Sequence, residues 1–72
     1  MADADVDALV IPADLQSDLE ARDAAAWFAA AAPSYRRNVL RFLKAAKTER
    51  TRKKRIALIA EAAAEGRQLP NY

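Results

Sequence analysis

The fold of this chain is decided by the stretch PSYRRNVLRFLKAA, residues 33–46. At 100° per residue its apolar side chains gather within about 100° of one another, and they are Tyr35, Val39, Phe42, Leu43 and Ala46. The bases Arg37, Arg41 and Lys44 gather on the opposite side. This pattern predicts a strongly amphipathic helix that opens at Pro33 and is capped by Ser34 or by the residue before the proline.

A second long helix follows directly. Thr48 is a natural N-cap, the helix runs to about Glu65, and Gly66 suits the first position after its end. Its predicted buried seam consists of Arg52, Ile56, Ile59 and Ala63. Residues 70–72 are predicted to form a tail, with Leu69 docking on the bundle.

Two shorter helices precede the central stretch. A helix over roughly 12–21 presents Leu15 and Leu19 on one face, after Ile11 and Pro12. A further helix near 24–32 begins at a predicted N-cap, Asp23, and carries one buried stripe that contains Ala24, Trp27, Phe28 and Ala31. Residues 1–9 are expected to form a disordered acidic leader because they hold little that could be buried.

The fold class predicted from these segments is all-α. We expect a small bundle of one short and three longer helices, forming a single domain over residues 10–69. The predicted core consists of Leu15, Leu19, Trp27, Phe28, Tyr35, Val39, Phe42, Leu43, Ile56 and Ile59.

Composition excludes many functions. The 72 residues include no cysteine and no histidine, so disulfides and thiolate or imidazole metal sites are excluded. A single glycine cannot build a glycine-rich phosphate loop. Asp14 and Asp18 are spaced as a carboxylate pair, but such pairs near a helix start are usually a solvated face. We therefore expect no enzymatic activity, no cofactor and no bound metal.

Targeting signals are also absent from the pattern. No apolar run approaches 18 residues, which excludes a transmembrane helix. The acidic start differs from the basic start of a signal peptide, so a cytoplasmic location is expected.

Charge is strongly segregated along the chain. Residues 1–33 carry seven acids and one arginine, whereas residues 34–55 carry ten bases and one acid, Glu49. The bases are the candidate anion- or partner-binding residues Arg36, Arg37, Arg41, Lys44, Lys47, Arg50, Arg52, Lys53, Lys54 and Arg55. Either the acidic half folds onto the basic half and neutralises it, which we favour, or the basic segment is exposed to an anionic partner.

The same choice between internal pairing and an external anion applies to the bases at the start of the last helix. Bases in its first turns oppose the helix dipole, at a cost of about 0.3–1 kcal/mol each when exposed. Asp14 and Asp18 could pair with Arg52 and Arg55, which is the favoured interpretation. Alternatively, an external phosphate or carboxylate binds there, or the bases are merely solvated.

Two further interpretations concern binding. The alanines beside the stripe of residues 24–32 indicate either a helix central to the fold, which we favour, or a surface that covers a partner. Nucleic-acid binding through residues 36–55 is possible but weakly indicated, because no side-chain pattern suits base edges and the aromatic residues are assigned to the core. An unidentified protein is the preferred partner, and the oligomeric state is undetermined.

The motifs taken together resemble one family. Pro12-x-Asp14-Leu15, Pro33-Ser34-x-Arg36-Arg37, Ala46-Lys47 and Thr51-Arg52-x-x-Arg55-Ile56 follow in order and end at Gly66. This pattern is similar to that of the bacteriocin-protection, YdeI or OmpD-associated family of small bacterial domains. The resemblance implies an accessory role in bacteriocin or stress tolerance, with no catalytic residues. It departs from the family pattern at Asn38, Val39 and Phe42, which leaves the basic motif intact.

Overall fold

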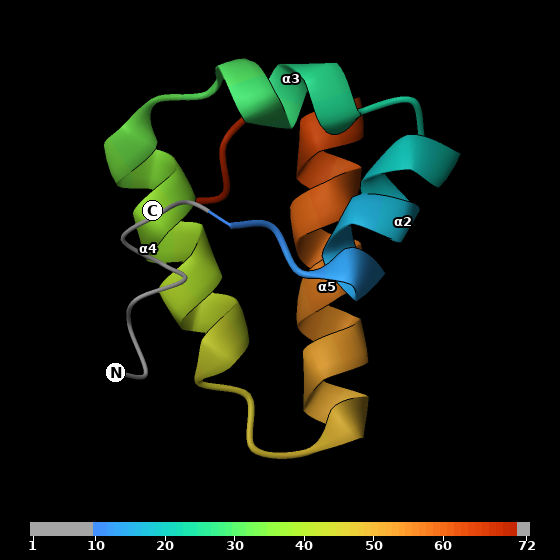
Figure 1. Ribbon diagram of the computed structural model, residues 1–72, viewed down its shortest axis with the longest axis vertical. Coiled ribbons are helices and arrows are strands. Elements are labelled where there is room, and N and C mark those ends of the chain that lie inside the picture. The colour runs from blue at the N-terminus through green and yellow to red at the C-terminus, as the bar shows by residue number, and fades with distance from the viewer. Residues whose placement is uncertain (1–9, 71–72) are drawn as a thin grey trace.

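The computed structural model describes residues 10–70, and within them the chain forms four helices (Figure 1). These are α2 (Ala13–Ala21), α3 (Ala25–Ala30), α4 (Pro33–Lys44) and α5 (Glu49–Ala64). The described part of the chain contains no β-strand, so the predicted all-α fold class is confirmed. The predicted leader, residues 1–9, and the end of the predicted tail lie outside the described residues.

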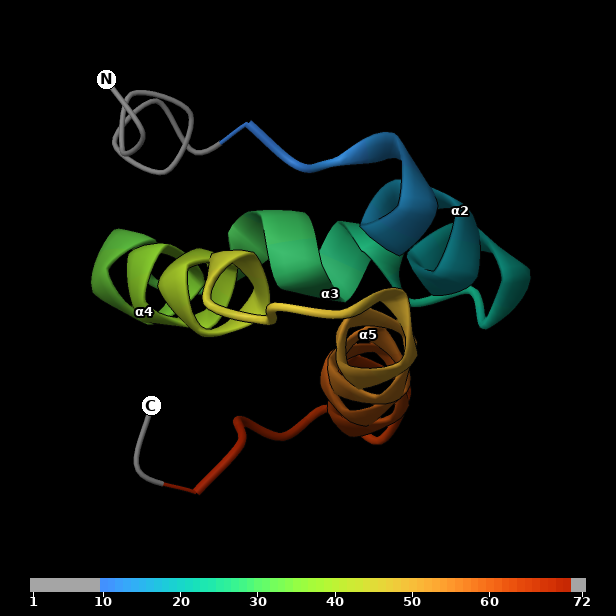
Figure 2. The same ribbon diagram turned by 90° about the horizontal axis from the view of Figure 1, so that it is seen from below.

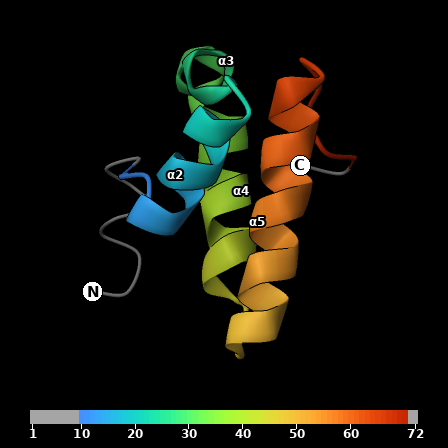
Figure 3. The same cartoon turned by 90° about the vertical axis from the view of Figure 1, so that its right-hand side faces the viewer.

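Helix α5 is the common neighbour of the other three. The short helix α2 crosses it obliquely, α4 packs beside it, and α3 contacts it near its C-terminal end (Figures 1 and 3). Its small residues permit this close approach, since Ala60, Ala62 and Ala63 are buried together with Ile56 and Ile59. The alanine-rich surface of α5 therefore allows three helices to pack against it.

Eight of the ten predicted core residues are buried, and two predictions are corrected. Trp27 and Phe42 are only partly buried and pack at the margin of the core, whereas Leu40, absent from the prediction, is 4% exposed. Phe42 lies at the edge of the apolar face of α4, with its ring beneath the Arg55 guanidinium. Trp27 meets Tyr35 edge to face at 6.3 Å between ring centroids. The Phe42 and Trp27 rings each keep one side towards solvent because they stand at the rim of the bundle.

The ends of α5 follow the sequence prediction. The Thr51 amide donates to Thr48 Oγ1 at 3.2 Å, which makes Thr48 the N-cap. Gly66 adopts a φ of +70°, and the amides of Gly66 and Arg67 donate to the carbonyls of Ala63 and Ala62. This is the Schellman arrangement that a C-terminal glycine favours.

The predicted N-cap role of Asp23 is wrong. Asp23 instead has a φ of +57°, and its amide and that of Ala24 donate to the carbonyls of Glu20 and Leu19. Asp23 therefore ends α2 in the same left-handed geometry that Gly66 provides after α5. Ala24, which is buried, occupies the N-cap position of α3 without a side-chain hydrogen bond.

The start of α4 resolves an alternative that the sequence left open. Ala32 is the N-cap, Pro33 is the first helical residue, and no side chain caps the helix. Ser34 therefore does not act as the cap. The predicted role of the residue before the proline is confirmed.

Helix α3 lies across one end of the bundle, so the favoured interpretation of a central helix is wrong (Figure 1). Only Phe28 is fully buried within it. Ala26, Ala29 and Ala30 are exposed, as are Ala32 and Pro33 beyond them. Six helical residues placed across the end can turn only one narrow side inward. We call this surface the alanine end.

The segment after α5 returns towards α4. The Leu69 amide donates to the hydroxyl oxygen of Tyr35 at 2.9 Å, and the Leu69 side chain packs on the core. The predicted docking of Leu69 is confirmed. It also satisfies the only polar atom of the buried Tyr35 side chain.

Candidate functional site

The ten predicted bases lie on α4, on the loop after it and on the first half of α5. The α4–α5 junction stands at the opposite end of the bundle from α3 (Figure 1), and Figure 2 looks onto it. Arg36, Arg52 and Arg55 make contacts within the fold that differ in kind.

Arg52 forms the predicted contact with the acidic half of the chain. Its Nε donates to Asp14 Oδ2 at 2.6 Å and its Nη2 to Asp14 Oδ1 at 3.0 Å, a bidentate pair between α5 and α2. The Arg52 guanidinium lowers the pKa of the Asp14 carboxyl, since a hydrogen-bonded cation stabilises its charged form. This ion pair joins the two helices at the start of α5.

Arg55 pairs with no carboxylate among residues 10–70. Its Nη1 donates to the backbone carbonyl of Phe42 at 2.6 Å, and its guanidinium carbon lies 4.5 Å from the centre of the Phe42 ring. The carbonyl belongs to the last turn of α4, where helical carbonyls lack partners within the helix. Arg55 thus caps α4 from α5 and covers an aromatic face at the same time.

Arg36 has a similar local role at the other end of α4. Its Nε donates to the carbonyl of Ala31 at 2.9 Å, in the turn between α3 and α4. The three arginines Arg36, Arg52 and Arg55 are half-buried and hold helices together. Sequence spacing indicated the Asp14 partner but gave no signal for the two backbone acceptors.

Six of the remaining seven bases face solvent to a larger degree. Arg41, Lys44, Lys47, Arg50, Lys53 and Lys54 are exposed, and Arg37 is half-buried on the same face of α4. We call these seven residues the basic end. Within residues 10–70 no ion pair or side-chain hydrogen bond engages Lys47, Arg50, Lys53 or Lys54. Among the acids of residues 10–33, the favoured neutralisation is realised at Arg52 and does not extend over these four.

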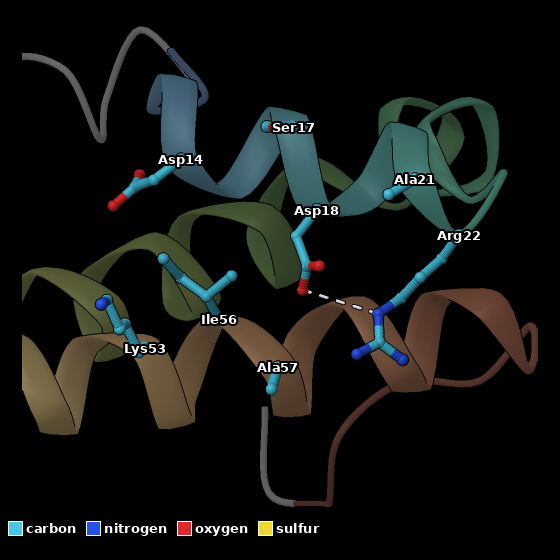
Figure 4. A pocket seen from close by; sticks show the side chains of 8 residues that line it. All are labelled: Asp14, Ser17, Asp18, Ala21, Arg22, Lys53, Ile56 and Ala57. Carbon is cyan, nitrogen blue, oxygen red and sulfur yellow. Dashed lines mark ion pairs between the residues drawn. The ribbon is translucent and has the colours of Figure 1, made fainter.

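An open groove lies between α2 and α5, beside the basic end (Figure 4). It has a volume of about 400 Å³ and an apolar floor that includes Ile56 and Ala57. Asp18 and Arg22 lie at one end of it, with Asp18 Oδ2 3.5 Å from Arg22 Nε, while Asp14 and Lys53 lie at the other. Opposite charges alternate along the groove, so it has no net preference for an anion or a cation.

The groove also places the two candidate carboxylates in separate ion pairs. Asp14 is held by Arg52 and Asp18 by Arg22, and neither is buried. A carboxylate whose pKa is lowered by a guanidinium is a weaker proton acceptor, which disfavours Asp14 as a general base. Among residues 10–70 no group of three or more acidic, cysteine or histidine side chains is arranged to hold a metal ion. No helix in that range has the length and apolar character needed to cross a membrane.

The order of the motifs along the chain now has a structural meaning, because each basic motif stands at a helix junction. A family model, described as bacteriocin-protection, YdeI or OmpD-associated, matches residues 8–66. The chain belongs to this family. Comparison with curated proteins and with solved structures found no match.

The matched region covers all four helices, and its motif residues fall into two groups. Arg36, Arg52 and Arg55 join helices, Ile56 packs in the core, and Thr51 supports the first turn of α5 through its contact with Thr48. Ser34, Arg37 and Lys47 have no such contact within residues 10–70. The part of the family pattern that explains the fold is therefore distinct from the part that is left at the surface.

Proposed function

We propose that this member of the bacteriocin-protection family is a non-enzymatic accessory module that acts by binding an anionic partner through its basic end. The observation that carries the proposal is the division among the ten bases. Three arginines hold the fold together, whereas Lys47, Arg50, Lys53 and Lys54 are exposed at or near the α4–α5 junction with no partner in residues 10–70.

The energetics support the same conclusion. Arg50, Lys53 and Lys54 lie in the first turns of α5, where the helix dipole disfavours positive charge. Their mutual repulsion adds to that cost, and only Glu49 offsets it locally. Side chains that reduce stability at an exposed surface are more simply explained by a contact with something outside the chain.

The groove supports the non-enzymatic part of the proposal. Its carboxylates are in ion pairs, the chain offers no histidine or cysteine, and the space is open rather than enclosed. General acid–base chemistry requires a group whose pKa is tuned towards neutrality by burial or by a like charge. The pKa of Asp14 is displaced in the opposite direction.

The test compares two variants of identical net charge. Arg50→Gln/Lys54→Gln removes two charges from the basic end, and Arg22→Gln/Arg67→Gln removes two from the ion pairs Arg22–Asp18 and Arg67–Glu65 near the alanine end. Poly-glutamate serves as a model acidic polypeptide, and binding is followed by nitrogen–proton NMR. We expect shifts around Lys47 and Arg50 in the wild type and in the second variant, and their loss in the first. Shifts that are absent in all three proteins, with poly-glutamate and with polyphosphate alike, contradict the proposal.

The cellular side of the proposal is tested with the same pair of variants. In a bacteriocin-sensitive host, expression of the wild type and of Arg22→Gln/Arg67→Gln is expected to raise survival. Arg50→Gln/Lys54→Gln is expected to give less protection at equal protein level. Equal protection by all three proteins contradicts a role for the basic end in tolerance.

A further inference from the structure

The spacing and surroundings of the exposed bases narrow the class of partner. On α4, Arg37, Arg41 and Lys44 follow one another along one face, at about 6 and 4.5 Å of axial rise. Lys47 stands on the loop, and Arg50 and Lys54 lie one turn apart on one face of α5. The α4–α5 junction thus carries exposed cations on the loop and on the first turns of α5.

The surface between these cations is poor in the groups that make a protein interface. Protein interfaces are depleted in lysine and are centred on buried aromatic anchors. Here four of the seven bases are lysines, and the nearest aromatic side chain, Phe42, is already covered by Arg55. Trp27 and Tyr35 pack against one another beside α3, at the far end of the bundle. An acidic protein would find charge here but no aromatic anchor, and the exposed apolar side chain nearby is Leu58, one turn beyond Lys54.

The same features suit a phosphate backbone. Duplex nucleic acid carries about one charge per 1.7 Å of its axis, together with condensed counterions. Basic side chains that neutralise its phosphates release these counterions, and the release favours binding. Such contacts need neither an apolar centre nor base-reading side chains. Binding to a single strand, by contrast, relies on exposed aromatic side chains for stacking, which the basic end does not provide.

From these observations we infer that the anionic partner is double-stranded nucleic acid, held through its phosphates without sequence preference. The inference rests on the proposed function, because both use the basic end. About four bases, centred on Lys47 and Arg50, can face one duplex. The affinity should then fall about a hundredfold between 50 and 200 mM salt.

Fluorescence anisotropy with labelled 20-base-pair duplexes tests the inference. Duplex DNA, duplex RNA and the corresponding single strand are each titrated at both salt concentrations, with poly-glutamate as competitor. We expect both duplexes to bind more tightly than the single strand, with little sensitivity to sequence. In Arg50→Gln/Lys54→Gln the affinity at 50 mM salt should fall at least tenfold and the salt slope by about two, because two phosphate contacts are lost.

The control Arg22→Gln/Arg67→Gln separates the basic end from net charge. Retained affinity in this variant supports the inference, whereas an equal loss in both variants overturns it. No duplex binding at 50 mM salt, together with poly-glutamate shifts around Lys47, overturns the nucleic-acid inference and leaves the proposed function standing. If neither the duplexes nor poly-glutamate bind, both the inference and the proposed function are overturned. Preference for the single strand over the duplex also overturns the inference. Circular dichroism melting confirms that both variants fold.

Discussion

At the α4–α5 junction, arginines are engaged inside the fold while their basic neighbours face solvent. At the other end, α3 presents Ala26, Ala29 and Ala30 to solvent and buries one large side chain, Phe28. The α4–α5 junction thus combines internal polar contacts with outward charge. The alanine end combines the buried Phe28 ring and the Trp27–Tyr35 pair with exposed alanines. Because different side chains stabilise the two ends, a substitution at one end can change the free energy of unfolding without altering the contacts at the other.

The largest effect is expected at the alanine end. Phe28→Ala removes a fully buried ring and should lower the free energy of unfolding by about 3–5 kcal/mol, since a cavity remains where the core cannot collapse. Urea unfolding followed by circular dichroism measures it. Ala29→Ser, at an exposed neighbouring position, should change the value by less than about 0.5 kcal/mol. Similar effects of the two substitutions would show that α3 is not anchored by Phe28.

The corresponding anchor at the basic end is Arg55. Arg55→Ala leaves the Phe42 carbonyl without its donor and uncovers the ring, so we expect a loss of about 1–3 kcal/mol. Lys54→Ala is the matched control on the adjacent, exposed position, and its effect should be near zero or slightly stabilising. If both variants melt like the wild type, Arg55 does not hold α4 to α5.

A smaller change, of opposite sign, is expected beside the alanine end. Asp23 has a left-handed backbone that costs a non-glycine residue about 1 kcal/mol. Asp23→Gly should therefore raise the free energy of unfolding by up to about 1 kcal/mol, and Asp23→Val should lower it. Thermal melting of the wild type, Asp23→Gly and Asp23→Val at one protein concentration measures these changes. Destabilisation by glycine would mean that the Asp23 side chain contributes more than its backbone costs.

The smallest effect on stability is expected for the exposed Arg52–Asp14 ion pair, which joins the basic half of the chain to the acidic half. The pKa of Asp14 is lower in the folded state than in the unfolded state, so its contribution is present above about pH 4 and is lost as pH falls through the folded pKa. Because both partners are substantially exposed, the contribution should stay below about 1 kcal/mol. Urea unfolding of the wild type and Asp14→Asn at pH 7 and pH 3, with and without 1 M salt, measures it. An Asp14→Asn variant that loses as much stability between the two pH values as the wild type contradicts this assignment.

Local sequence rules predicted the parts of the fold that depend on local geometry. Thr48 and Gly66 mark the ends of α5 because a side-chain hydroxyl and a positive φ act within one turn. The same rules failed at Asp23, since an aspartate suits both an N-cap and a left-handed position, and tertiary packing decides between them. The extra buried residue Leu40 and the exposed alanines of α3 likewise depend on where neighbouring helices lie.

The candidate site was predictable in its composition and only partly in its contacts. Charge counting located the bases, and complementary charge indicated Asp14 for Arg52. No charge pattern could indicate that Arg55 would bind the Phe42 carbonyl, 13 residues earlier in the chain, because every residue has a carbonyl. The distinction between structural and exposed arginines therefore required the arrangement of α4 against α5.

The shared position of α5 has a consequence for hydrogen exchange. Because α2, α3 and α4 all pack on this helix, its central amides cannot open without separating the other helices from their common neighbour. Amide protons from Ile56 to Ala63 should then exchange together, at the rate set by complete unfolding, whereas those near Glu49 can exchange by fraying. The four helices would then unfold as one cooperative unit.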